Sequence, residues 1–220
     1  MFDIIIPSCR PFSELAQKIS LIKENDDIKF NYIPTGFSVS ASVNRNYGFY
    51  EAMKSDNEYI IMIDDDIGGF YKGWQCDLIK PLIEDREIKL VSARLMNPDG
   101  SQGPMMGVLP DLSKDIIDVP AFMQFEKFKF KAILSAAIAF RKSDIVESGV
   151  RFNNNFVGSG FEDTLFCFHL CKAFKDCRIV CTNNCKLIHY HEMKNQSENF
   201  KYNENLFKTI LACEAEDAKS

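Results

Sequence analysis

The sequence has no apolar run of the length that a membrane-spanning helix needs, and residues 1–4 lack the charged start and long apolar segment of a secretory signal. We therefore expect a cytoplasmic protein without a transmembrane segment. An excess of basic residues is also missing, since the net charge is -5. That charge argues against a surface built for nucleic-acid phosphates, although a local basic patch at 127–131 stays compatible with it.

Cysteine is plentiful, but the C-x2-C spacing typical of a zinc site is missing. Five of the 8 cysteines lie between Cys167 and Cys185. In a reducing cytosol these side chains are free thiols of the core in one interpretation. In the other interpretation they hold a structural metal.

The apolar content is sufficient for a packed core, because 46% of the 220 residues are hydrophobic and 12% are aromatic. This length accommodates one substantial α/β domain or two small ones. Short apolar runs alternate with helical periodicity, which predicts parallel strands joined by right-handed crossovers. We expect strands at 2–7, 28–34, 59–63, 88–96, 132–141 and 186–188, and helices at 11–22, 42–54, 77–85, 142–148, 165–174 and 198–215.

Two of these helices show a sided pattern. On the helix at 42–54, Val43, Tyr47 and Tyr50 share one side. The helix near the end carries an apolar stripe that predicts packing against the core, formed by Leu206, Phe207, Ile210 and Leu211. The segment 101–131 is either a surface lid or acceptor-binding loop, or an irregular connection with core aromatics, and its last residues alternate like a half-exposed strand.

Three adjacent carboxylates, Asp64-Asp65-Asp66, follow the apolar run at 59–63 directly. Such a run is typical of a buried strand in a parallel sheet, and ligands of open α/β sheets gather at the carboxyl ends of strands. Adjacent like charges repel, but a hard divalent cation that bridges them to a phosphate makes the arrangement favourable. The alternative is a solvated acidic turn.

A second acidic pair, Glu162-Asp163, follows Gly158-Ser159-Gly160-Phe161 and precedes an apolar helical pattern. Glycines let the backbone come close to a ligand, and carboxylates at a helix start are favoured by the helix dipole. The pair therefore indicates either catalytic carboxylates or an ordinary acidic helix start.

Two of the 3 histidines, His189 and His191, follow the strand expected at 186–188, and strand periodicity places both imidazoles on one face. This arrangement favours a ligand role for at least one of them.

The order of the motifs is more specific than any one of them, and it resembles that of the family-2-type glycosyltransferases of the GT-A fold, in the nucleotide-diphospho-sugar transferase superfamily. The motifs are Ile4-Ile5-Ile6-Pro7-Ser8-Cys9-Arg10, Ser42-Val43-Asn44-Arg45-Asn46-Tyr47-Gly48, Asp64-Asp65-Asp66, Ser135-Ala136-Ala137-Ile138-Ala139-Phe140-Arg141-Lys142 and Gly158-Ser159-Gly160-Phe161-Glu162-Asp163. The resemblance covers roughly residues 2–192. It implies a Rossmann-like α/β fold, with a single GT-A domain over residues 1–195 in which helices flank a mainly parallel mixed sheet. Residues 196–220 are then a C-terminal helix packed on that domain, or a tail.

The resemblance also implies roles for individual residues. The implied nucleotide-sugar-binding residues are Pro7, Ser8, Arg10, Arg45, Asp64 and Asp65. Asp66 is the implied metal ligand, joined by His191 or His189, of which His191 is preferred. Glu162 and Asp163 are the implied catalytic pair, with Asp163 as general base.

The implied activity is a metal-dependent transfer of a sugar from a nucleoside-diphosphate sugar, with UDP-sugars favoured, to an acceptor hydroxyl with inversion. Mn²⁺ or Mg²⁺ held by Asp66 would stabilise the charge that develops on the diphosphate, and Asp163 would accept the proton of the attacking hydroxyl. The acceptor is a glycan, a small molecule or a modified biopolymer. Two departures affect acceptor contacts, because Phe152-Asn153-Asn154 stands where relatives often have Phe-Asp-Glu, and Phe168-His169-Leu170 stands where they often carry an Arg.

Two other functions use a similar sheet. A nucleotidyltransferase acting on a sugar phosphate would carry a glycine-rich basic loop after the first strand, where this chain has Pro7-Ser8-Cys9-Arg10. A non-catalytic nucleotide-sugar-binding module is the other alternative, and the presence of both acidic motifs disfavours it.

Overall fold

The structure is a computed structural model that describes residues 2–8, 10, 13, 16, 20, 22, 30–34, 40–103, 113–120, 122–125, 128–190 and 197–217. Its strands are β1 (Phe2–Ser8), β2 (Phe30–Pro34), β3 (Tyr59–Ile63), β4 (Ile67–Gly68), β5 (Ile88–Met96), β6 (Ile116–Asp118), β7 (Phe122–Phe125), β8 (Phe128–Phe130), β9 (Ala137–Arg141) and β10 (Arg178–His189). Its helices are α2 (Ala41–Ala52), α3 (Trp74–Glu84), α4 (Lys142–Ser148), α5 (Glu162–Ala173) and α6 (Ser197–Asp217).

The main sheet is mixed but mainly parallel. Its strand order is β2-β1-β3-β9-β5-β10-β4, and β6 pairs with β10. Strands β2, β1, β3, β5 and β10 run in one direction, because β9 is antiparallel to both β3 and β5. The carboxyl ends of β1, β3 and β10 therefore lie at the same edge of the sheet, which is the edge where open α/β sheets bind ligands.

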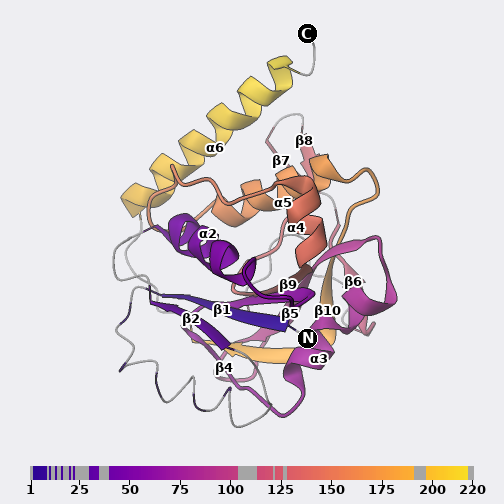
Figure 1. The fold of residues 1–220 in the computed structure, drawn as a ribbon. Coiled ribbons are helices and arrows are strands. Elements are labelled where there is room, and N and C mark those ends of the chain that lie inside the picture. The colour runs from indigo at the N-terminus through magenta and orange to yellow at the C-terminus, as the bar shows by residue number, and fades with distance from the viewer. Residues whose placement is uncertain are drawn as a thin grey trace.

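Helices cover both faces of this sheet (Figure 1). One apolar cluster joins α2, α4, α5 and α6 to one face, through side chains such as Phe49, Phe166 and Phe207. A second cluster joins α3 to the other face, with Trp74 and Leu78 fully buried. The strands supply both clusters by alternation, because successive side chains of a strand point to opposite faces. In β3, Ile60 and Met62 belong to the first cluster, and the residues between and beside them belong to the second.

The observed elements confirm the expected α/β pattern with shifts at their ends, apart from the helix expected at 11–22, which lies largely outside the described residues. The helix at 142–148 and the strand at 88–96 have the predicted bounds. Helix α3 begins at Trp74 rather than at 77, because Gly73 with φ +87° allows the chain to turn into the helix earlier. Strand β9 begins at 137, whereas 132–136 is irregular, and β10 extends over Arg178–His189 instead of three residues.

The buried face of α2 differs from its apolar pattern. Tyr47 and Tyr50 are 50% and 62% exposed, so the side that they share with Val43 faces solvent. The opposite face is buried and consists of Ser42, Asn44, Arg45, Gly48, Phe49 and Ala52. Burial of a charged residue on this face is possible because carboxylates from other elements pair with Arg45.

The end of the 101–131 segment forms a hairpin, in which β7 pairs antiparallel with β8. The other residues of the segment lie partly outside the described part of the chain. Cys167, Cys177, Cys181 and Cys185 are free thiols buried in the two apolar clusters. No helix of the described residues has the length and apolar character needed to cross a membrane.

Candidate active site

The register of β1 and β3 brings the first acidic motif to the end of β1. These strands are parallel, with Ile5 opposite Met62, so Ser8 and Asp65, each three residues further along the chain, lie at the same level. Accordingly, the hydroxyl of Ser8 donates a hydrogen bond to Oδ2 of Asp65, and Nε of Arg10 lies 3.4 Å from the same oxygen. The backbone N–H of Arg10 donates to Oγ of Ser8, which fixes the loop after β1.

The register of β4 and β10 brings a histidine to the third acid. These strands are antiparallel, with His189 opposite Ile67, and the backbone N–H of Tyr190 donates to the carbonyl of Asp66. Nε2 of His189 consequently lies 3.3 Å from Oδ2 of Asp66, and both side chains are mostly buried. His191, the preferred ligand from the sequence, lies outside the described residues.

Arg45 of α2 joins the two acidic motifs. Its Nη2 donates to Oδ1 of Asp64 at 3.0 Å, and its Nη1 donates to Oε1 of Glu162 at 2.8 Å. The guanidinium also stacks on Phe152, with 5.3 Å between Cζ and the ring centroid. Arg45 is only 4% exposed, so its charge is compensated by these carboxylates and not by water.

The segment before α5 has an unusual backbone conformation. Gly158 and Gly160 have φ of +65° and +114°, and Phe161 has φ +69°, the only positive φ of a residue other than glycine in the described chain. Such a conformation is costly for an aromatic residue and persists only where the surroundings enforce it. It places the N–H of Gly160 against Oε2 of Glu162, so that this carboxylate contacts both the loop and Arg45.

The acids at this site have shifted titration behaviour. Burial and the nearby charge of Glu162 together raise the pKa of Asp163 to about 7, against the lowering effect of Arg45. Burial also raises the pKa of Asp64, against the lowering effect of Arg45 and with a contribution from Asp66. Burial alone would lower the pKa of Arg45, but its carboxylate neighbours outweigh this effect, and the pKa is raised. Asp163 is thus the carboxylate whose proton affinity is matched to neutral pH.

Asp163 is 9% exposed, and its Oδ1 accepts a hydrogen bond from the backbone N–H of Thr164 at 2.7 Å. The backbone of Ser135 is a second donor to this carboxylate. Ser135 precedes β9, and the carbonyl of its neighbour Ala136 accepts the N–H of Asp64. The loop before β9 therefore contacts both acidic motifs.

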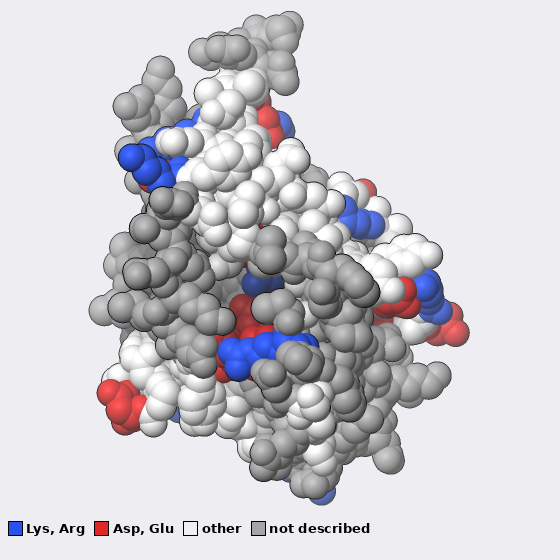
Figure 2. All heavy atoms as spheres, turned by 90° about the vertical axis from the view of Figure 1, so that its left-hand side faces the viewer, with Lys and Arg blue, Asp and Glu red and all other residues white. Residues whose placement is uncertain are grey.

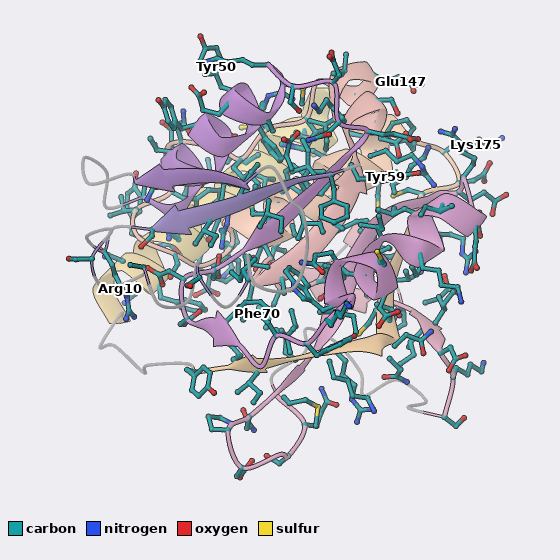
Figure 3. The ribbon with its side chains drawn as sticks, turned by 60° about the horizontal axis from the view of Figure 1, so that its bottom comes forward. Arg10, Tyr50, Tyr59, Phe70, Glu147 and Lys175 are labelled. Carbon is teal, nitrogen blue, oxygen red and sulfur yellow. The ribbon has the colours of Figure 1, made fainter. Side chains whose placement is uncertain are left out.

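The site residues expected from the sequence form three adjoining groups in the structure. Ser8, Arg10 and Asp65 form one, Arg45, Asp64, Glu162 and Asp163 form the second, and Asp66 and His189 form the third. Pro7 is buried within β1, opposite Ile33 of β2. Arg10 lies on the side of the molecule to which the arrowhead of β1 points, whereas Glu147 and Lys175 lie at the other end (Figure 3). On the face drawn in Figure 2, acidic and basic side chains gather in a hollow near the centre.

Asn203 of α6 was not among the residues expected from the sequence. It contacts residues 157–160 before α5, the glycine segment. A signal was present, because Asn203 stands one helical turn before Phe207 and two before Leu211, on the apolar stripe. A polar residue at a position expected to be buried needs hydrogen-bond partners, which for Asn203 are Val157 and Ser159.

The side chains that could act as metal ligands fit a divalent cation that is shared with a substrate. Asp66 and His189 provide one carboxylate and one imidazole, and carboxylate oxygens suit Mg²⁺ and Mn²⁺. Among the described residues, no group of three or more His, Cys, Asp or Glu side chains could hold an ion alone. Mg²⁺ sites often consist of one or two carboxylates completed by substrate phosphates. An ion at Asp66 would accordingly need a diphosphate as co-ligand.

The sequence matches no protein-family model and no curated protein. Its structure is similar to that of GalNAc-T7 determined with UDP, GalNAc and Mn2+, at a TM-score of 0.57 and 14% identity, over 91% of this chain and 40% of that one. It is also similar to TarS of S. aureus, at a TM-score of 0.54 and 13% identity, over 94% of this chain and 64% of that one. The chain thus spans well under the full length of both. These two proteins are GT-A glycosyltransferases, and the chain has the same fold, a single GT-A domain.

Proposed function

We propose that the chain is a metal-dependent glycosyltransferase that moves a sugar from a nucleoside-diphosphate sugar to an acceptor hydroxyl. The observation that carries this proposal is the bridge made by Arg45 between Asp64 and Glu162. Two acidic motifs that lie far apart in the sequence meet at one buried guanidinium, at the edge of the sheet where ligands bind. An acidic turn and a helix start with purely local roles would have no reason to converge.

The donor nucleotide would occupy the groups nearest β1. Ser8, Arg10 and Asp65 form a connected polar set after this strand, and Arg10 supplies a cation for a phosphate. Pro7 would shape the pocket floor, and Asp64, held by Arg45, would accept from the ribose or sugar hydroxyls. A UDP-sugar is favoured because GalNAc-T7, which shares the fold, was determined with UDP.

Asp66 and His189 would hold Mn²⁺ or Mg²⁺ together with the donor diphosphate. When bound, such an ion stabilises negative charge on the departing diphosphate. The Arg45 guanidinium, kept charged by its neighbours, keeps Asp64 and Glu162 in fixed positions while this charge forms.

Asp163 would act as the general base. In the reaction, the acceptor oxygen attacks the anomeric carbon, the bond from that carbon to the diphosphate breaks, and the hydroxyl proton passes to the Asp163 carboxylate. A pKa of about 7 leaves a substantial ionised fraction at neutral pH and gives the carboxylate enough basicity to take the proton. A single displacement of this kind inverts the configuration at the anomeric carbon. Glu162, held by Arg45 and Gly160, would position the acceptor.

A panel of nucleotide sugars tests the proposal directly. The purified chain is incubated with UDP-, GDP- and dTDP-sugars and Mn²⁺, with and without chelator, and released nucleoside diphosphate is detected by mass. We expect release from at least one donor, dependent on the metal, since water can replace an absent acceptor slowly. If no donor in the panel is bound or cleaved under any metal condition, the proposal is wrong.

A further inference from the structure

Asn203 of α6 forms hydrogen bonds with the segment 157–160, which leads to the proposed catalytic pair Glu162 and Asp163. Oδ1 of Asn203 accepts the N–H of Val157 at 2.9 Å, and its Nδ2 donates to the carbonyls of Val157 at 2.8 Å and Ser159 at 3.3 Å. Asn203 is 0% exposed. The amide therefore replaces water for three backbone groups, much as a neighbouring strand would.

The start of α2 holds the same segment from another side. The N–H of Ala41 donates to the carbonyl of Gly158 at 2.9 Å, and Oγ of Ser40 donates to the carbonyl of Phe156 at 2.8 Å. Residues 156–160 thus make backbone contacts to α2 and α6, which are far apart in the sequence. Because α2 also carries Arg45, the segment and the arginine are attached to one rigid element.

The packing of α6 leaves little room for the segment to move. A Cβ built on Gly160 would lie 3.0 Å from Cδ2 of Phe200, and one on Gly158 would lie 3.3 Å from Nδ2 of Asn199. The ring of Phe161 lies 4.9 Å from that of Phe200 and 5.4 Å from that of Phe207. The positive φ of Phe161 is therefore enforced by α6.

The fastened segment is connected to the charged centre by hydrogen bonds. Gly160 donates its N–H to Glu162, Glu162 accepts from Arg45, and Arg45 donates to Asp64. A displacement of residues 157–160 would move Glu162 and the first turn of α5, which contains Asp163. We propose that Asn203 is a positioning residue for the catalytic pair, an inference that rests on the proposed glycosyl transfer.

The expected effect of losing this amide is on turnover more than on donor binding. Asn203→Ala frees the carbonyls and N–H of the segment, and a misplacement of about 1 Å at the reacting groups lowers kcat roughly 10- to 100-fold. The KM for the donor should change little, because the proposed donor contacts come from β1, β3 and α2. Two control variants lie on the same helix, namely Leu211→Ala, which removes a buried contact away from the segment, and Asn205→Ala, which is exposed.

Hydrogen exchange measures how strongly Asn203 holds the backbone of residues 157–160, independently of any activity. Each variant is measured at the same number of degrees below its own melting temperature. Under these conditions the amides of Val157 and Gly160 should exchange faster in Asn203→Ala than in Leu211→Ala. If they exchange equally in both variants, Asn203 does not hold the segment and the inference is wrong. This measurement remains valid even if the wild-type chain turns over no nucleotide sugar, an outcome that would contradict only the proposed function.

The kinetic comparison then separates positioning from stability. We expect Asn203→Ala to lose kcat with donor KM retained, whereas Leu211→Ala loses stability with normal kcat and Asn205→Ala changes neither. Asn203→Asp provides a second variant, because its protonated carboxyl can both donate to and accept from Val157 while the ionised form cannot donate. Its kcat relative to wild type should rise as the pH falls. Equal kcat values for Asn203→Ala and Leu211→Ala, or a pH-independent ratio for Asn203→Asp, would overturn the positioning role.

Discussion

Two arginines of this chain are buried to almost the same degree but have different surroundings. Arg45 is 4% exposed and Arg141 is 1% exposed. Arg141, at the end of β9, donates to the backbone carbonyls of Ile88, Leu82 and Asp85 and to one carboxylate, that of Asp144. The hydrogen bonds of the Arg45 guanidinium go to the carboxylates of Asp64 and Glu162.

The two guanidinium groups differ in how far their surroundings balance the charge. At Arg141, Lys89 adds a second cation beside Asp144, and three backbone carbonyls accept hydrogen bonds from Nη1 and Nη2 of the guanidinium. At Arg45, one cation faces Asp64, Glu162 and Asp163, and burial together with the charge of Glu162 raises the pKa of Asp163 against the effect of Arg45. A folded protein keeps such an imbalance at a functional site, where a substrate or ion can relieve it.

Replacing the proposed base should have the largest effect. Asp163→Asn should lower turnover roughly 10²- to 10⁴-fold while the fold and donor binding persist, because the amide has nearly the same size but cannot accept the proton. Turnover and melting temperature are measured on one preparation. The matched control is Asp144→Asn at Arg141, which should lose stability and keep its rate.

The opposite pattern for Asp163 would show a helix cap. A cap replacement costs about 1 kcal/mol of stability and leaves the rate nearly normal. A destabilised but fully active Asp163→Asn variant would therefore remove this residue from the catalytic mechanism.

Replacing the proposed metal ligand should come next. Asp66→Ala should abolish the effect of Mn²⁺ on donor affinity, because the remaining imidazole of His189 cannot hold the ion alone. Isothermal titration of the nucleoside diphosphate, with and without chelator, measures this. Asp99→Ala, in an exposed turn, is the control. Equal affinity with metal and with chelator in the wild type would contradict the metal site.

Replacing each of the two arginines should lower the stability of the protein by different amounts. Arg141→Met removes the donor to three buried backbone carbonyls and one of the two cations that contact Asp144, and should cost about 3–5 kcal/mol of unfolding free energy. Arg45→Met should cost less, about 1–3 kcal/mol, because Asp64 is 28% exposed and can be solvated. Its turnover should nevertheless be lost. Urea unfolding measures both variants, and a greater stability loss for Arg45→Met would reverse the comparison.

The stability of the folded chain should depend on pH through Asp163. Burial and Glu162 raise its folded pKa to about 7, against Arg45, and Cys167 lies close to it. An unfolded Asp has a pKa of about 3.9, so the folded state binds the proton more tightly and loses stability as the pH rises from about 4 to about 7. Asp163→Asn should thus gain stability relative to wild type across this window.

The same pKa should appear in the kinetics. Because the base must be ionised, kcat/KM of the wild type should rise with pH through about 7. The Asp163→Asn variant should lack this limb. Urea unfolding and rate profiles over the same pH values check both statements, and a wild-type profile without a limb near 7 would contradict them.

Much of the architecture follows from local pattern. The run at 59–63 predicts a buried strand because all its side chains are apolar, and it is buried on both faces in the structure. The order of strands and helices predicts a mainly parallel sheet, and the strand directions confirm this. The exact ends were less accessible to sequence reasoning, because Gly73 and the irregular segment before β9 depend on what packs around them.

The candidate site residues were named one by one from the sequence, but their arrangement was not. The motifs identify Asp64, Asp66 and Glu162 as candidates, while nothing local states that Arg45 joins two of them. The Tyr47 and Tyr50 side of α2 faces solvent, and the opposite side is buried through Phe49 and Ala52. Arg45 is tolerated on that buried side because carboxylates of other elements neutralise it. A hydrophobicity pattern cannot predict that a helix face with an arginine is buried, because the carboxylates that neutralise the arginine come from other elements.

Local composition and periodicity are enough to name the residues that could do chemistry and the ends of the elements at which they stand. They do not predict which carboxylates share one cation, which of them has a pKa near neutrality, or which side chain of α6 contacts residues 157–160. These properties depend on distance and burial between groups that are far apart along the chain. Electrostatic interactions and desolvation act through space, and they exist only once the sheet register has brought those groups together.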